Sequence, residues 1–287
     1  MDIAENAARL STALLVLREL VHVSCGHLAR EPRFEVKTLL GDHLHDDARA
    51  VGKLHARRGE LGGDHAVAPS PELAALLDRA YGDDFLEVAY GELKPTLIAA
   101  LRAHLERVDP LLDEPTHRLL NQLAYRQERH TAELPAASRR VAVEDVGALP
   151  LEAGERVLRV LPPPDRPARD AFIQIVDAPA RAHPVHDLTN AKLAAAEWAA
   201  RASHERTDLP WDFHEDMARL CWDSVRHAEI LDRHMATELG CHWGDHPVAP
   251  AAGGLATTNG GLPQDLEQYL RADEARHARI AARWDLG

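Results

Sequence analysis

A helical pattern that recurs four times constrains the fold of this chain more than any other feature. Aligned on one Arg, the copies are HDDARAVGK at 45–53, YRQERHTAE at 125–133, WDSVRHAEI at 222–230 and DEARHARI at 273–280. Apolar residues around each copy recur at steps of three, four and seven, which is typical of a helix with one buried stripe. The polar positions inside these stripes are therefore expected to face an interior.

Two of these polar positions, three residues apart, have side chains that can bind metal. The first position holds an acid or its replacement, and the second holds an imidazole or its replacement. In the order of the chain, the pairs are Asp47 with Ala50, Gln127 with His130, Ser224 with His227, and Glu274 with His277. Residues at this spacing share one helix face, one turn apart. Carboxylate di-iron sites of four-helix bundles use the same Glu-x-x-His spacing, and the last copy retains it.

The composition predicts a helical protein without a nucleic-acid or membrane partner. Aromatic residues make up 5% of the chain, and Ala, Leu and Arg are abundant, which favours helices over sheets. The net charge of −13 disfavours nucleic acid and anionic membranes, because both select basic surfaces. The three cysteines have no metal-ligand spacing, and the sequence contains no signal peptide or membrane span. We therefore expect a cytoplasmic protein.

The expected organisation is all-α, with two tandem helical bundles joined by a proline-rich connector. The N-terminal bundle covers 1–140, the connector 141–184 and the C-terminal helical domain 185–287. A short β-like run, 172–176, lies in the connector. The expected helices cover 5–30, 33–58, 72–81, 84–108 with a kink at Pro95, 116–134, 188–203, 211–239 and 265–284.

The segment from about 158 to 287 resembles a bacterial branch of the ferritin-like superfamily. The likeness rests on LPPPDRPARDAFIQIVDAP, HDLTNAKLAAAEWAA, DLPWDFHEDMARLCWDSVRHAEIL and DEARHARIAARW. Residues 1–140 look like a second, more diverged ferritin-like bundle. The resemblance implies that Glu274 and His277 match the terminal Glu-x-x-His and that His227 matches the imidazole of the other pair. Lys192 and Ser224 stand where the resemblance leads us to expect carboxylates.

Two candidate metal sites follow, each with a structural alternative. In the C-terminal domain, Glu274, His277 and His227 are completed by Glu197 or by a carboxylate of the N-terminal domain. The alternative is a buried polar network in which Arg, His and Glu satisfy one another. Lys192 either takes the place of the cation and neutralises Glu274, or extends to the surface along its alkyl chain.

In the N-terminal bundle the candidate ligands are three carboxylates and one imidazole, accompanied by Gln127. They are Glu19, Asp47, Glu92 and His130. The alternative is that Glu19 and Glu92 face solvent, as most helix acids do.

The leading functional hypothesis is a non-haem iron oxidoreductase, di-iron or reduced to one iron, that activates dioxygen on a small-molecule substrate. Iron is the expected cofactor, and a homodimer is among the expected assemblies. The alternative is a metal-free ferritin-like binding or interaction protein, favoured by the substitutions at Ser224, Gln127, Ala50 and Lys192. Iron storage in a cage is weaker, because storage shells normally use one bundle per chain.

Overall fold

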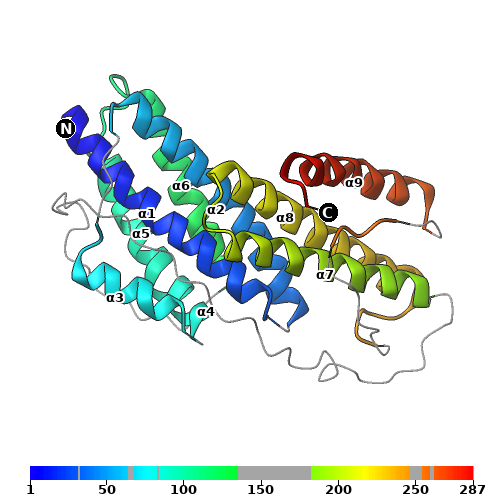
Figure 1. Ribbon diagram of the computed structural model, residues 1–287. Coiled ribbons are helices and arrows are strands. Elements are labelled where there is room, and N and C mark those ends of the chain that lie inside the picture. Colours follow the sequence, from blue (N-terminus) through cyan, green and yellow to red (C-terminus); the bar gives the residue numbers. More distant parts are fainter. Residues whose placement is uncertain are drawn as a thin grey trace. The chain divides into compact units, whose positions relative to one another are not determined.

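The computed structural model describes residues 1–31, 33–63, 68–82, 84–134, 182–245, 254–258 and 262–286. Regular secondary structure within these ranges is helical, and they contain no strand (Figure 1). The all-α prediction is thus confirmed for the described part of the chain. None of its helices has an apolar stretch long enough to cross a membrane.

The described residues group into two compact units. Unit 1 contains those of 1–24 and 46–134, and unit 2 contains those of 25–45 and 182–286. The long helices α1 (Ile3–Leu28) and α2 (Phe34–Glu60) each contribute to both units. The sequence-based division instead placed both helices entirely in an N-terminal bundle.

Unit 1 continues with five shorter helical segments. They are α3 (Pro71–Ala80), α4 (Phe85–Val88), the π-helix η1 (Ala89–Leu93), α5 (Lys94–Leu105) and α6 (Glu114–Glu133). The Ser70 hydroxyl accepts a hydrogen bond from the Leu73 N–H at the start of α3. Asp113 accepts one from the Thr116 N–H at the start of α6. Both helices therefore begin at side-chain caps that satisfy otherwise unpaired donors.

The helix expected over 84–108 is interrupted by the π-helix η1, which ends two residues before Pro95, the position of the predicted kink. Pro95 lies in the first turn of α5 and has no N–H to donate to the carbonyl of Gly91, four residues earlier in η1. A π-turn contains one extra residue, and each residue rotates an α-helix by about 100°. The extra residue therefore changes which side chains face the core, and both Glu92 and Lys94 are buried.

Unit 2 is built on two helices that run side by side, α7 (His183–Glu205) and α8 (Trp211–His234). The chain continues through the π-helix η4 (Met235–Leu239), which ends at Gly240 in the left-handed region with φ 70°. The last helix, α9 (Gln264–Trp284), packs on α8. Its buried Leu270 joins an apolar cluster with Leu231 and Met235.

Helices α2 and α8 approach closely within unit 2. A Cβ atom added at Gly41 would lie 2.5 Å from Cγ2 of Val225, closer than real Cβ contacts come. A larger residue at position 41 would therefore force the Val225 side chain or its helix to shift.

Nearly all of the predicted connector, 141–184, lies outside the described residues, together with its β-like run 172–176. Its last residues, 182–184, lead into α7.

Candidate functional site

A buried lysine lies at the centre of the polar residues of unit 1. The Nζ atom of Lys94 is 2.7 Å from Oδ2 of Asp47, 2.8 Å from Oε1 of Gln127 and 3.2 Å from Nδ1 of His130. The side chains of Lys94 and Asp47 are each 2% exposed. Gln127 also donates from Nε2 to Oδ1 of Asp47 at 2.6 Å. Two predicted metal ligands, Asp47 and His130, therefore converge on an ammonium group.

The neighbours of His130 fix its tautomer. Burial lowers the pKa of His130, and the Lys94 ammonium lowers it further, so the imidazole is neutral at pH 7. Because Nδ1 accepts from Lys94, the proton is on Nε2, which lies 3.5 Å from Asp46. Burial raises the pKa of Asp46, but His130, Arg126 and Arg129 outweigh the burial and keep that pKa below its ordinary value.

The other two candidates of unit 1, Glu19 and Glu92, are bound by the end of α3 and the residue after it. Glu92 accepts a bidentate pair of hydrogen bonds from Arg79, at 2.6 and 2.8 Å. Glu19 accepts a hydrogen bond from the Tyr81 hydroxyl at 2.8 Å. Both carboxylates are buried, so the alternative that they face solvent is wrong.

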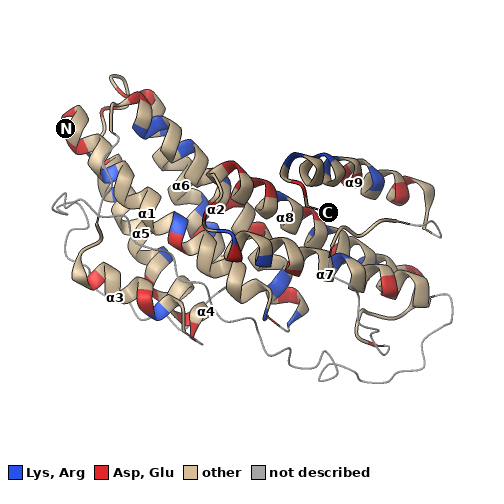
Figure 2. Cartoon of the chain, viewed as in Figure 1, with Lys and Arg blue, Asp and Glu red and all other residues tan. Residues whose placement is uncertain are grey.

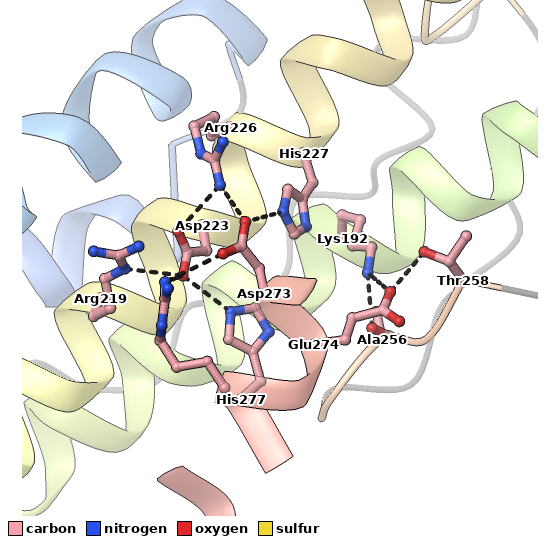
Figure 3. A network of polar contacts seen from close by, with 11 residues as sticks. Lys192, Arg219, Asp223, Arg226, His227, Ala256, Thr258, Asp273, Glu274 and His277 are labelled. Atoms are coloured by element: carbon pink, nitrogen blue, oxygen red, sulfur yellow. Dashed lines mark hydrogen bonds and ion pairs between the residues drawn. The ribbon is translucent and has the colours of Figure 1, made fainter. Parts of the chain in front are cut away.

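In unit 2 a second buried lysine binds the acid of the last helix. Lys192, on α7, is 1% exposed, and its Nζ atom lies 2.6 Å from Oε1 of Glu274 and 2.8 Å from the carbonyl oxygen of Ala256. Thr258 donates to the same Glu274 oxygen at 2.6 Å (Figure 3). Burial lowers the pKa of Lys192, and the Glu274 carboxylate opposes that effect. The interpretation that Lys192 reaches the surface is wrong, and its pairing with Glu274 is what the structure shows.

Helices α8 and α9 exchange contacts reciprocally beside this lysine (Figure 3). His227 of α8 lies 3.1 Å through Nε2 from Oδ2 of Asp273 on α9. His277 of α9 lies 3.3 Å through Nε2 from Oδ2 of Asp223 on α8. Arginines follow the same rule: Arg226 donates to Asp273, and Arg276 is 3.3 Å from Asp223. Each aspartate thus receives the imidazole and the guanidinium of the opposite helix.

This exchange sets the protonation of its members. Burial raises the pKa of Asp223, but hydrogen bonds from His277 and Arg219 outweigh the burial and hold that pKa far below its usual range. Burial lowers the pKa of His227 to about 4, and the positive charges of Lys192 and Arg226 lower it further. The hydrogen bond with Asp273 raises this pKa but does not outweigh them. His227 is therefore neutral at pH 7, with its proton on the nitrogen that faces Asp273.

Glu197, the fourth candidate in unit 2, forms an ion pair with Lys37 of α2. The four predicted ligands of this unit therefore contact four different partners. Glu274 contacts Lys192, His277 contacts Asp223, His227 contacts Asp273, and Glu197 contacts Lys37. These residues of unit 2 form a buried polar network, which is the arrangement that the sequence analysis gave as the alternative to a metal site.

Sequence reasoning missed several members of these networks, among them Lys94, Asp46, Asp223 and Asp273. A signal for the aspartates was present, because Asp223 and Asp273 each stand four residues before the histidine of their copy. Asp46 stands at the same position of the first copy, and it is the aspartate beside His130. Lys94 carried no such signal, because the π-turn before it changes the helical register.

Comparison of the chain with protein-family models, with curated proteins and with solved structures found no match. The ferritin-like resemblance therefore stays a prediction that rests on the sequence motifs.

Proposed function

We propose that the protein is a metal-independent binding protein of ferritin-like type, in which an internal lysine takes the place of the metal in each unit. One observation carries the proposal: Asp47, Gln127 and His130 are all within 3.2 Å of the Lys94 ammonium. This ammonium uses the carboxylate, the amide oxygen and the imidazole lone pair that a metal ion would need.

A divalent metal ion and the Lys94 ammonium cannot both occupy the space between Asp47, Gln127 and His130, because both are positively charged. At 4 Å and an effective dielectric constant of 20, a divalent ion and an ammonium repel each other by about 8 kcal/mol. One carboxylate, Asp47, contacts this position, and Lys94 already neutralises it. The residues of unit 1 therefore do not fit a metal ion while Lys94 is in place.

Unit 2 supports the proposal independently. Lys192 neutralises Glu274, the acid that the sequence placed in the metal site. Asp273 contacts Nε2 of His227, and Asp223 contacts Nε2 of His277. These contacts position both histidines, although Lys192 and Ser224 stand where carboxylates were expected. The same exchange of a metal for a lysine is thus proposed twice in one chain.

The competing proposal is the non-haem iron oxidoreductase, with iron held by Glu274, His227 and His277 and a small-molecule substrate. It is favoured by the Nδ1 atom of His227, which is buried and has no hydrogen-bond partner among the described residues. Such an atom can bind iron. Iron bound there would bind and activate dioxygen. The Lys192 ammonium beside Glu274 opposes this cation as Lys94 does in unit 1.

Metal analysis separates the two proposals. The protein is purified anaerobically from iron-replete cells, and its metal content is measured by mass spectrometry beside Glu274→Ala and Asp47→Ala. The metal-independent proposal predicts trace metal in all three proteins. Stoichiometric iron that is lost in Glu274→Ala would support the oxidoreductase in unit 2, and loss in Asp47→Ala would place the iron in unit 1.

A further inference from the structure

The buried imidazole of His227 has a hydrogen-bond acceptor that no described residue uses. His227 is 1% exposed, its Nε2–H donates to Asp273, and its Nδ1 atom is buried without a partner in the described part of the chain. A buried polar atom without a partner costs about 1–3 kcal/mol, and most such atoms in folded proteins find a partner. The described residues therefore leave the Nδ1 lone pair of His227 without a hydrogen-bond donor.

Lys192 supplies the complementary half of this site. Its ammonium has three N–H groups, and two of them meet acceptors that the structure describes, Glu274 and the carbonyl of Ala256. Lys192 lies close enough to His227 for its charge to act on the imidazole, and the two side chains neighbour each other in Figure 3. Within the described residues, one N–H donor of Lys192 and one acceptor atom of His227 in this buried network thus have no partner.

Unit 1 shows how the equivalent groups are satisfied without a ligand. By the sequence repeat, Gln127 corresponds to Ser224 and His130 to His227. Lys94 contacts both Gln127 and His130 directly, so its three N–H groups have three acceptors. In unit 2 the shorter Ser224 replaces the amide, and Lys192 makes its described contacts elsewhere.

We propose that unit 2 binds one neutral hydroxyl group, which accepts a hydrogen bond from the Lys192 ammonium and donates one to Nδ1 of His227. The hydroxyl belongs either to an ordered water or to a small alcohol. This assignment rests on the proposed metal-independent function and gives its ligand a chemical class.

The charge of the site selects a neutral ligand. Lys192 and Glu274 already balance each other, so neither an anion nor a cation would find an uncompensated opposite charge in this pair. The positive charges of Lys192 and Arg226 disfavour a proton on His227, and they disfavour a metal ion at Nδ1 for the same reason. A hydroxyl carries both the acceptor and the donor that the two spare groups need.

Nitrogen NMR of the whole protein, labelled with ¹⁵N-histidine, tests the proposal. Nδ1 of His227 is expected to resonate as the unprotonated nitrogen of a neutral ring. Its frequency should be lower than that of an unprotonated nitrogen whose lone pair accepts no hydrogen bond. Ethylene glycol is then added, with 1,4-dioxane as a probe of similar size that cannot donate. A shift of His227 Nδ1 with ethylene glycol alone assigns the site to an alcohol. A hydrogen-bonded Nδ1 that neither probe moves assigns it to water.

The matched controls are His130 and Ser224→Gln. His130 accepts directly from Lys94, so its Nδ1 resonance should not respond to either probe. Ser224→Gln introduces the amide that unit 1 uses at this position, and it should abolish the ethylene glycol response of His227. A free lone pair on His227 in the wild-type protein would overturn the hydroxyl site and leave the metal-independent function standing. A stoichiometric shift of His227 Nδ1 on addition of Zn²⁺ would overturn both.

Discussion

The Nζ atom of Lys94 lies 2.7 Å from Oδ2 of Asp47, and both side chains are almost fully buried. Moving two charges out of water is costly, and the mutual attraction offsets that cost only if the remaining hydrogen bonds are also made. Gln127 and His130 make them. The pair is therefore a compensated unit, and the loss of one member should cost more than the loss of both.

We expect Asp47→Ala to lower the free energy of unfolding by about 3–5 kcal/mol, because it leaves the Lys94 ammonium buried and unpaired. Adding Lys94→Met to Asp47→Ala should recover part of this loss. Urea denaturation followed by circular dichroism measures both. Glu128→Ala is the control: it breaks a half-exposed pair with Arg102 and should cost less than about 1 kcal/mol. An Asp47→Ala loss as small as that of Glu128→Ala would refute the compensated-pair argument.

Two glycines of α2 should respond in opposite directions to alanine. Gly41→Ala places a Cβ atom against Val225 and should destabilise the protein by about 1–3 kcal/mol. Gly59→Ala meets no atom within 4 Å and should stabilise it by up to about 1 kcal/mol through helix propensity. Val225→Ala should relieve part of the Gly41→Ala loss. Equal effects of the two substitutions on the urea midpoint would contradict the close helix contact.

Stability should fall as the pH drops from 7 to 5. Burial lowers the pKa of both His104 and His227 to about 4, below the value of about 6.5 in the unfolded chain. The unfolded state therefore binds protons first, so the full stability is present above pH 6.5 and is lost between pH 6.5 and 4. Each histidine should remove about 2 kcal/mol by pH 5. Urea titrations at both pH values measure the loss, which His104→Gln should reduce. An unchanged pH dependence in His104→Gln would exclude this origin.

The three cysteines should resist alkylation in the native protein. Burial raises the pKa of the Cys25 thiol to about 12 and raises the pKa values of Cys221 and Cys241 as well. The reactive thiolate is therefore scarce, and all three side chains are buried. Iodoacetamide should label all three cysteines in guanidinium, and it should label none of them quickly in the native protein. Peptide mapping identifies the labelled cysteines. Cys241 is the least fully enclosed and should react first, so faster labelling of Cys25 would contradict the burial order.

The pattern of charges along a helix did not by itself reveal the networks, as α9 illustrates (Figure 2). Acidic and basic residues are interspersed along α9, as on many solvated helices. Asp273 and Arg276 belong to the reciprocal contacts with α8, whereas Arg271 pairs with Glu267 on α9 itself. The sign of the charge does not separate the two kinds of residue. What marks Asp223 and Asp273 in the sequence is their position four residues before a histidine in the last two copies of the repeat.

The sequence by itself determined the helices and the faces that they bury. Periodicity predicted α9 within one residue of its observed ends, and it placed Asp47, Gln127, His130, His227 and His277 in buried positions, where the structure finds them. Helical register is a local property, set by residues within a few turns, so it can be derived from one chain segment at a time. The partners of these side chains were decided by tertiary structure. Lys94 reaches Asp47 and His130 only because η1 changes the register before it and because α5 packs with α6. A buried charge pairs with the group that folding brings nearest, and that distance is a property of the packed helices.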